Sequence, residues 1–431
     1  MPNKMLKWQD PLKFAEKISY NYGDRNWAFL YSSLNKSTKN SYSYIALFPK
    51  KEIVSDDFLS ILEVTKKDQN KWFGFLSYEL AQDFEKLPKT KKSFINLPKI
   101  WLINFSLILE FNHDKKTLRA VFDNNKYLDE VLKYKALSKI TSQIKVKDFY
   151  SNFSDESYLS AIEEIKKMIA DGDFYQTNLT RKFFGKFSQK QTHQNNFELF
   201  SRLAEASPAN YSSFLKFGKN SIISSSPELF LKIENNDTII SRPIKGTAAR
   251  SENLAIDKKN KLNLQNSVKE KAENLMIVDL VRNDLARICK AGTVVVKNLF
   301  NITSYKTIHH MSSEIHGKID KNFTIKDILL ACFPAGSMTG APKIKAMEII
   351  AKKEKVNRGI YSGAIGYLSS SSANLAVVIR TLILQDDKFE FQVGGAITFD
   401  SKPKSELKEI FSKAKAIKKL LKLNFNKSIE I

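Results

Sequence analysis

The sequence predicts an α+β fold with antiparallel sheets, and two observations lead to this prediction. The first quarter of the chain alternates short apolar runs with polar turns, which is typical of strands. The later chain places further strand-like runs between segments whose apolar residues recur at helical spacing. With 431 residues the chain can form a large core, since this length corresponds to about three domain-sized units.

The N-terminal region is expected to consist mostly of strands. All four tryptophans lie in it, and its apolar runs are WAFLYSSL, YSYIALFP, WFGFLSYEL and IWLINFSLILEF. A lysine-rich stretch near 130–150 follows and is the expected boundary between two parts of the chain. We therefore divide the chain into an N-terminal region, residues 1–150, and a second region, residues 151–431.

The second region begins with a predicted helix. Ser154 is a suitable N-cap, apolar residues recur at helical spacing from Tyr158 to Ile169, and Gly172 ends the pattern. An antiparallel meander is then predicted from four strand-like runs separated by short turns, at 211–217, 221–226, 228–234 and 238–245.

Three helices and three strands are predicted in the remaining chain. A long, largely apolar helix is expected over 265–288, and a second helix over 341–353, where Pro342 suits the first turn. Pro403 opens a last helix with an apolar face. The three strands are expected at 360–369, 374–385 and 388–398.

The composition argues against several classes of protein. No stretch approaches the roughly 18 uninterrupted apolar residues of a membrane span, and the first ten residues lack the apolar core of a signal peptide. A cytoplasmic protein without a membrane partner is therefore expected. Cys289 and Cys332 cannot build a disulfide framework, and neither has a partner at zinc-site spacing.

The net charge of +23 suggests an anionic partner such as nucleic acid. Lysine supplies most of this charge and is spread along the chain rather than gathered with aromatic residues. This distribution favours a solvated surface and no nucleic-acid partner. A basic nucleic-acid-binding protein is the alternative from a different class, and strong binding with a steep salt dependence would identify it.

Charged residues interrupt the apolar helix around EKAENLMIVDLVRNDL. Asp279 and Arg282 are three residues apart and can pair on one face, which favours a structural role for both. Apart from Lys269, Glu273 has no cation three or four residues away, so a metal or catalytic role becomes more plausible for it. Mg²⁺ is typically held by one or two carboxylates. Glu409 is a candidate second ligand, although its spacing alone favours a solvated helix charge.

Three further positions have the chemistry of a binding or catalytic site. FPAGSMTGAPK places Gly336 and Gly340 before a helix start, which suits a carboxylate better than a nucleoside triphosphate because the spacing differs from a Walker loop. Arg380 lies inside a predicted apolar strand and is compatible with structural pairing or substrate binding. Lys245 could act as a nucleophile if burial lowered its pKa, although lysines are common in this chain.

Several of these segments together resemble the chorismate-utilising enzymes, in the order of that family and over roughly residues 155–420. They are IADGDFYQTNLTR, SSSPELF, SRPIKGT, KAENLMIVDLVRNDL, FPAGSMTGAPKIKAMEII, RGIYSGAIGY, VVIRT and GGAITFDSKPKSELKEI. WFGFLSYEL and FEKLP are similar to the amino-terminal region of the anthranilate and aminodeoxychorismate synthases. The resemblance implies two packed, largely antiparallel sheets flanked by helices, with residues 151–431 as the chorismate-binding catalytic region.

The resemblance also implies roles for individual residues. Glu273 and Glu409 match the carboxylates that hold Mg²⁺. Glu228 matches the general acid that protonates the departing C4 hydroxyl of chorismate, and His310 the histidine beside the substrate. Tyr361 and Arg380, with the backbone near Gly395, match the site of the enolpyruvyl carboxylate. The full set of expected substrate contacts is Thr247, Thr339, Tyr361, Arg380, Gly394 and Gly395.

Two positions divide the family by reaction. Members that add water carry a lysine base where this chain has Gln176, and Gln176 is expected in the catalytic site. Because glutamine cannot deprotonate water, the resemblance implies a nitrogen nucleophile. Lys245 stands where anthranilate synthases usually have alanine and aminodeoxychorismate synthases have lysine. The resemblance therefore implies amination of chorismate at C4 for 4-aminobenzoate and folate synthesis, with anthranilate synthase component I as the alternative.

Ammonia in this family comes from a glutamine amidotransferase with its own Cys-His-Glu site. The sequence has no recognisable site of this kind, so a separate glutaminase subunit is the expected partner. Two residues depart from the family pattern. Glu270 stands where aspartate is common, and Ala396 stands where glycine usually lets the backbone approach the substrate carboxylate.

Overall fold

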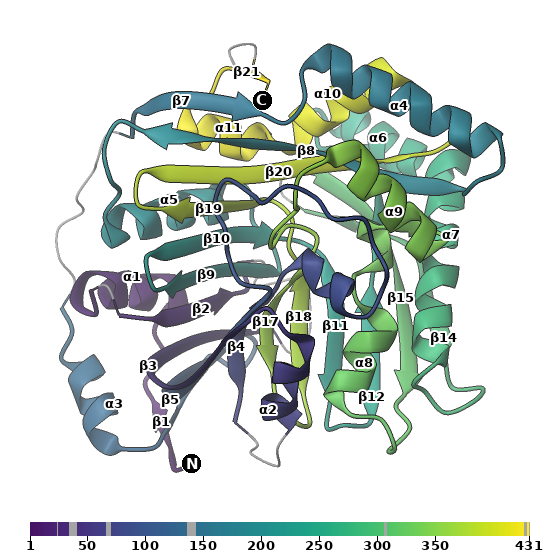
Figure 1. Cartoon of the computed structure of the whole chain (residues 1–431). Helices are drawn as coiled ribbons and strands as arrows, with labels where there is room; N and C mark the ends of the chain where they lie inside the picture. The colour runs from purple at the N-terminus through teal and green to yellow at the C-terminus, as the bar shows by residue number, and fades with distance from the viewer. Residues whose placement is uncertain are drawn as a thin grey trace.

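The computed structural model describes residues 1–23, 25–33, 41–65, 70–135, 144–305, 308–425 and 429–430 (Figure 1). Its strands form two largely antiparallel sheets that share a long ribbon of β3 (Tyr42–Ser55) and β5 (Ile100–Asn112). Residues 100–104 of β5 pair with a strand of the second sheet, β4 (Trp72–Leu76). Residues 107–112 of β5 pair with a strand of the first sheet, β6 (Thr117–Phe122).

The first sheet extends from both sides of this ribbon. From β3 it continues through β2 (Trp27–Tyr31), β9 (Tyr211–Phe217), β10 (Asn220–Ser226), β19 (Thr381–Gln385), β20 (Lys388–Ile397), β8 (Gln176–Phe187), β7 (Val146–Ser151) and the parallel strand β21 (Ile429–Glu430). From β5 it continues through β6 (Thr117–Phe122) to β1 (Asn3–Leu6), and β16 (Gly340–Ala341) pairs with the start of β8.

The second sheet leaves β5 on the side of its first half. Its strands follow in the order β4 (Trp72–Leu76), β17 (Ala364–Leu368), β18 (Ala373–Val377), β11 (Leu229–Glu234), β12 (Thr238–Arg242), β15 (Ile308–Lys318) and β14 (Val295–Ser304). β13 (Ile244–Ala249) pairs with the part of β15 that β12 leaves free.

Helices cover the outer faces of both sheets (Figure 1). The first sheet packs against α1 (Pro11–Asn21), α3 (Asn125–Leu132), α4 (Asp155–Ala170), α5 (His193–Ala206), α10 (Pro403–Lys413) and α11 (Lys415–Leu421). The second packs against η1 (Phe58–Ile61), α2 (Leu62–Thr65), α7 (Val268–Ala286) and α8 (Ile325–Cys332). The remaining helices are η2 (Tyr78–Asp83), α6 (Leu254–Asn266), η3 (Gly336–Met338) and α9 (Lys343–Glu354).

A third group of buried side chains lies between the sheets. It combines Ala28 and Leu215 of the first sheet with Phe73 and Ala376 of the second, all of them fully or almost fully buried. Burial of apolar surface on both faces of each sheet supplies the main stabilising contribution to such a fold. The arrangement confirms the predicted α+β fold of two packed, largely antiparallel sheets flanked by helices.

Two links carry the chain from one sheet to the other at the same place. The first joins β10 to β11 through Pro227 and Glu228, and the second joins β18 to β19 through residues 378–380. Backbone hydrogen bonds tie the links together, since Ser225 N–H donates to the carbonyl of Arg380 at 3.2 Å and Val377 N–H donates to that of Glu228 at 3.0 Å. This crossing places Glu228 beside Arg380.

The crossing explains two wrong predictions. The expected meander is interrupted in its middle, because β10 pairs with β19 and β11 pairs with β18 instead of with each other. Pro227, between them, has no N–H to give to a ladder. The expected strand 374–385 is broken at residues 378–380, where Arg380 has a left-handed φ of 51° that ends the extended run.

The last predicted helix is also divided, into α10 and α11, at Ala414.

Other predicted elements are confirmed. The Ser154 side chain accepts a hydrogen bond from Ser157 N–H at the start of α4, as expected for an N-cap. α7 and α9 correspond to the helices predicted over 265–288 and 341–353, with Pro342 at the N-cap of α9. Part of the expected boundary near 130–150, residues 136–143, lies outside the described residues.

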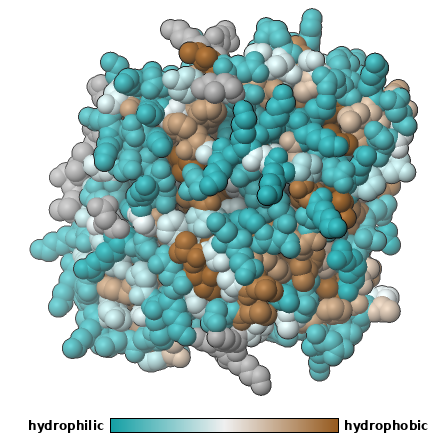
Figure 2. Space-filling view, in the orientation of Figure 1, coloured by the Kyte–Doolittle hydropathy of each residue, from teal (hydrophilic) through white to brown (hydrophobic). Residues whose placement is uncertain are grey.

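The surface is mainly hydrophilic on the face seen in Figure 2, where hydrophobic residues form separate small groups. This agrees with a lysine-rich, solvated surface. None of the helices in the described ranges is long and apolar enough to cross a membrane.

A buried carboxylate ties the N-terminal region to a loop of the second region. Glu79, in η2, accepts hydrogen bonds from the backbone N–H groups of Arg358, at 2.6 Å, and Gly359, at 2.9 Å. Burial raises the pKa of Glu79 to about 7, although Lys182 and the two N–H donors act in the opposite direction. The same loop carries Tyr361, so this contact supports a predicted site residue.

We expect Glu79→Gln to remove a pH dependence of stability between about pH 4.5 and 7. The folded-state pKa lies above the unfolded value of 4.5, so the folded protein holds the proton more tightly and loses stability as the pH rises through this window. The loss amounts to about 3 kcal/mol. Urea unfolding at both pH values measures it, with the exposed Glu205→Gln as control. Equal pH dependence in wild type and Glu79→Gln would contradict the expectation.

Candidate active site

A cavity of about 450 Å³ lies where the two sheets exchange strands. Its wall combines Glu228 and Arg380 of the crossing with the start of β13, the end of β20, and parts of α7 and α10. The residues that line it run from Asn178 to Lys413 in the sequence. The whole wall therefore comes from the second region of the chain.

Most of the predicted site residues meet in this cavity. Those that line it are Glu228, Lys245, Thr247, Glu273, His310, Tyr361, Arg380, Gly394, Gly395 and Glu409. They come from eight strands, helices, loops and links that are distant in the sequence, so the fold brings together the residues expected from the motifs.

Gln176 and Thr339 are not among the residues that line the cavity. Gln176 is 1% exposed and lies opposite Ala341 in the β8–β16 pair. Thr339 is fully buried, and its hydroxyl donates to the carbonyl of Gly336 at 3.2 Å. Both residues therefore lie outside the cavity lining, and the catalytic role of Gln176 and the substrate contact of Thr339 stay predictions.

Lys245 presents a buried amine to the cavity. Its Nζ donates to the carbonyl of Ser337 at 3.3 Å, and the residue is 9% exposed. Burial lowers the pKa of Lys245, while the carboxylates of Glu273 and Glu228 partly oppose this shift. A neutral, nucleophilic amine is therefore more accessible here than at a surface lysine.

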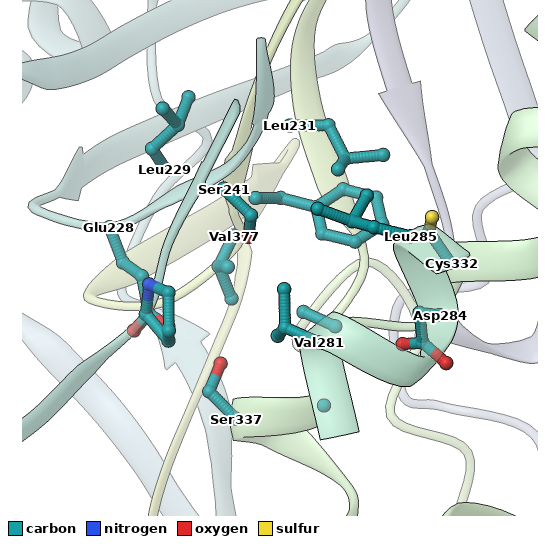
Figure 3. A pocket seen from close by; sticks show the side chains of 14 residues that line it. Glu228, Leu229, Leu231, Ser241, Val281, Asp284, Leu285, Cys332, Ser337 and Val377 are labelled. Carbon is teal, nitrogen blue, oxygen red and sulfur yellow. The ribbon is translucent and has the colours of Figure 1, made fainter. Parts of the chain in front are cut away.

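Glu228 borders both the cavity and a small pocket behind it. Figure 3 shows this pocket, of about 10 Å³, with Glu228 and Ser337 on one side and Cys332 and Asp284 on the other. Burial raises the pKa of Glu228, and this effect outweighs the hydrogen bond from Ser337 and the charge of Lys245. A raised pKa favours the protonated form of a carboxyl group, which can donate a proton to a leaving group.

Arg380 gives one corner of the cavity its positive charge, and His310 lies beside it. An Arg380 Nη2 group lies 3.4 Å from His310 Nε2, which accepts the hydrogen bond in the neutral ring. Burial, with the Arg380 charge, lowers the pKa of His310 to about 3. Within the described residues no carboxylate lies at ion-pair distance from Arg380, so its guanidinium is available to an anionic ligand.

Carboxylates gather on the side of the cavity formed by α7 and α10; they are Glu270, Glu273, Glu406 and Glu409. Lys269 Nζ lies between two of them, 3.7 Å from Glu273 Oε1 and 3.6 Å from Glu406 Oε1. Lys413 Nζ lies 2.7 Å from Glu409 Oε1, and Glu409 is 46% exposed. Lysine amines therefore balance much of the negative charge.

This donor set fits a hard cation. Burial raises the pKa of Glu270, and the charge of Glu273 adds to the shift; burial also raises the pKa of Glu406, with Glu409 adding. A bound cation would relieve this crowding of like charges. In the described part of the chain no group of three or more His, Cys, Asp or Glu side chains is arranged to hold a metal. Such a cation would therefore also need oxygen from water and substrate.

Two other sequence interpretations can be compared with the structure. Asp279 and Arg282 pair at 2.8 Å on the surface of α7, which confirms the predicted pairing. The segment expected to bind an anion before α9 lines the cavity through Ser337 and Met338, and the anion site itself stays a prediction. A Cβ on Gly340 would lie 2.1 Å from the carbonyl of Gln176, so glycine serves the close approach of β16 to β8.

Asn178, Gln392 and Lys413 are among the polar residues of the cavity lining that the sequence analysis missed. Two of them had a visible signal. Gln392 is a polar residue in the largely apolar run FEFQVGG, and Lys413 follows Glu409 at the four-residue spacing of a helical ion pair. Ala396 also lines the cavity, so the departure from the family pattern lies at the site itself.

Comparison with known proteins gives consistent matches. Residues 15–419 match the family described as chorismate binding enzyme. Aminodeoxychorismate synthase component 1 of Escherichia coli (strain K12) is 35% identical over 350 residues, which cover 81% of this chain and 76% of that protein. Anthranilate synthase component 1 of Acetivibrio thermocellus is 33% identical over 372 residues, which cover 81% and 74%.

A solved structure agrees with these matches. Anthranilate synthase component I from Streptococcus pneumoniae TIGR4 superposes with a TM-score of 0.77 at 26% identity, covering 90% of this chain and 93% of that one. The range matched by the family contains every residue that lines the cavity.

Proposed function

The chain belongs to the chorismate binding enzyme family, and on this basis we propose that it is the synthase subunit that aminates chorismate at C4 to 4-amino-4-deoxychorismate. The observation that carries the proposal is the buried amine of Lys245 in the cavity wall, at the position where anthranilate synthases usually have alanine. The product is a precursor for 4-aminobenzoate and folate synthesis.

In the proposed reaction the neutral amine of Lys245 forms a bond to C2 of chorismate. The two ring double bonds shift and the C4–O bond breaks, while Glu228 gives its proton so that the hydroxyl leaves as water. Ammonia then forms the C4–N bond, the double bonds shift back, and the bond from C2 to Lys245 breaks with its electron pair returning to the amine. The attacking nitrogen loses its extra proton to Glu228. The covalent step divides one difficult substitution into two easier ones.

The remaining predicted residues bind and orient the substrate in this proposal. Arg380 and Tyr361 hold the enolpyruvyl carboxylate, and neutral His310 orients the Arg380 guanidinium through the 3.4 Å contact. Burial raises the pKa of Tyr361 well above its usual value, so its phenol stays protonated and donates. The backbone at Gly394 and Gly395 leaves space for the ligand because neither residue has a side chain.

We propose that Glu273 and Glu409 hold Mg²⁺. When bound, the ion supplies positive charge that offsets the ring carboxylate of chorismate. Within this chain, Lys269 and Lys413 must then release their contacts to the same carboxylates.

We expect chelation by EDTA to abolish activity and Glu409→Gln to weaken Mg²⁺ binding at least about tenfold, because one of two anionic ligands is lost. Calorimetric titration with MgCl₂ measures the affinity directly. Glu163→Gln, exposed on α4, is the matched control. Equal Mg²⁺ affinity in wild type and Glu409→Gln would remove this residue from the metal site.

The proposed ammonia source is a separate glutamine amidotransferase subunit. Both cysteines are buried, and burial raises the pKa of Cys289 to about 11 and that of Cys332 further. Neither thiol therefore has the lowered pKa of a glutaminase nucleophile. The naming of the matched E. coli protein as a component 1 supports a second component.

Anthranilate synthesis is the second candidate, favoured by the similarity to the A. thermocellus and S. pneumoniae proteins. The two reactions differ in the fate of the enolpyruvyl group. Amination at C4 keeps it, whereas anthranilate formation releases it as pyruvate. Incubation with chorismate, MgCl₂ and ammonium, followed by a lactate dehydrogenase assay for pyruvate, separates them: consumption of chorismate without pyruvate supports the proposal, and equimolar pyruvate contradicts it.

A further inference from the structure

We propose that Ser304, His309 and Asp257 form a second nucleophilic site, outside the cavity, at which the Ser304 hydroxyl attacks small activated carboxylic esters. An unbroken chain of side-chain contacts carries the proposal. Ser304 Oγ lies 2.8 Å from His309 Nδ1, and His309 Nε2 lies 3.1 Å from Asp257 Oδ1. A hydroxyl, an imidazole and a carboxylate in this order are the groups of a serine hydrolase site, here with the two ring nitrogens exchanged relative to the serine proteases.

Three elements bring these residues together on the second sheet. Ser304 and His309 lie directly opposite each other at the end of the β14–β15 pair (Figure 1). Asp257 lies in the first turn of α6, which contacts both of these strands. His309 and its neighbour His310 point to opposite faces of β15, because side chains alternate along a strand. His310 lines the cavity and the three residues of the proposed site do not, so the two sites are separate.

The neighbours of Asp257 fix the positions of the protons in this chain of contacts. Asp257 Oδ1 accepts hydrogen bonds from Arg250 Nε at 2.8 Å and from the Ser251 N–H at 3.0 Å. These donors hold the pKa of Asp257 well below its usual value, so its carboxyl group is ionised. A carboxylate cannot donate, so Nε2 carries the proton in the neutral ring of His309. The Nδ1 lone pair therefore accepts from the Ser304 hydroxyl and can take its proton.

The nucleophile is exposed, whereas the base behind it is buried. Ser304 lies at the surface, and His309 is 1% exposed. A small electrophile can therefore approach the hydroxyl from solvent while the imidazole stays held by its two partners. Arg250 adds a positive charge nearby, since its Nη1 group donates to the carbonyl of Tyr305, the residue after Ser304. This charge favours the negatively charged oxygen that develops when a hydroxyl adds to a carbonyl group.

The proposed reaction needs the ester and water alone. Ser304 Oγ forms a bond to the carbonyl carbon of the ester, and its proton moves to His309 Nδ1. The bond to the alcohol then breaks, and the leaving oxygen takes that proton from His309. Water repeats both steps on the acylated serine, which releases the carboxylic acid and restores the hydroxyl. Asp257 offsets the positive charge that His309 carries in each half of the reaction.

Covalent labelling by diisopropyl fluorophosphate tests the nucleophile directly. Ser304 Oγ forms a bond to phosphorus, the P–F bond breaks with fluoride leaving, and His309 takes the serine proton. After digestion, mass spectrometry gives the labelling rate of each serine. The internal control is Ser160, an exposed serine on α4 whose hydroxyl lies 3.5 Å from a carboxylate oxygen of Glu164 instead of a histidine.

We expect Ser304 to be labelled at least about 100-fold faster than Ser160 in the wild-type protein, because a positioned general base contributes this much. His309→Gln should remove this advantage, and Asp257→Asn should reduce it because an amide no longer fixes the ring proton. Thermal unfolding checks that each variant is folded. Equal labelling of Ser304 and Ser160 in the wild type, or a wild-type rate at Ser304 in folded His309→Gln, would overturn the proposal.

Ester turnover tests the substrate class with the same protein. Multiple-turnover hydrolysis of p-nitrophenyl acetate is measured for the wild type and for Ser304→Ala, an exposed position where loss of the hydroxyl leaves the fold intact. We expect Ser304→Ala to lose at least about 90% of the hydrolysis rate above the rate in buffer. Equal rates in the two proteins would overturn ester hydrolysis at this site. Neither measurement involves chorismate, so the outcome is independent of the proposed function.

Discussion

Lys245→Ala is expected to lower the rate of C4 amination by more than about 10³-fold, because the covalent step loses its nucleophile. The amine of Lys245 is buried, and its pKa is lowered by burial, so it is suited to attack rather than to ion pairing at the surface. Product formation from chorismate and ammonium, followed by liquid chromatography and mass spectrometry, measures the effect.

Lys245→Arg separates a nucleophile from a positive charge. Arginine keeps the charge but stays protonated, so it cannot attack C2, and we expect it to be as inactive as Lys245→Ala. Lys404→Ala, an exposed lysine on α10 outside the cavity, is the control. Substantial amination by Lys245→Arg, or unchanged formation of aminodeoxychorismate by Lys245→Ala, would show that Lys245 is not the essential nucleophile.

Glu228→Gln is expected to reduce kcat by about 10²- to 10⁴-fold with little change in the KM for chorismate. Glutamine keeps the size and polarity of the side chain but has no acidic proton for the departing C4 hydroxyl. Steady-state kinetics of the purified variant test this, with Glu234→Gln, at the exposed end of β11, as control.

The pH profile gives a second readout for Glu228. Burial raises the pKa of Glu228, so the protonated acid persists to a higher pH than in an exposed glutamate, and activity falls as the pH rises through that pKa. Lys245 acts in the opposite sense, because activity rises as its amine loses a proton. We expect Glu228→Gln to lose the alkaline fall. An alkaline fall of wild-type shape in this variant would assign it to another group.

Local sequence patterns predicted the individual elements better than the way they connect. α4 could be predicted because an N-cap, an apolar stripe and a terminal glycine are all local signals. The crossing could not be predicted, because the apolar run through Arg380 continues without a visible break while the backbone turns at φ 51°. The same holds for Pro227, which lies between two runs of the expected meander and carries the chain to the other sheet.

The same difference between local patterns and long-range packing applies to the residues of the site. Motif resemblance placed Glu228, Lys245 and Arg380 in one site, and the crossing brings them to one cavity. It did not show that Gln176 and Thr339 lie outside the cavity lining, where Gln176 is buried and a tight turn uses the Thr339 hydroxyl. A motif names the segments near a ligand, whereas side-chain access depends on packing between segments that are distant in the sequence.

The most direct test of the account is the product that the purified chain forms from chorismate, MgCl₂ and ¹⁵N-ammonium without a partner subunit. We predict a product that retains the enolpyruvyl group, carries one ¹⁵N and shows that nitrogen bonded to C4 in its NMR spectrum. Labelled anthranilate would contradict the account and assign the chain to amination at C2, and unlabelled isochorismate would show that water, rather than ammonia, is the nucleophile.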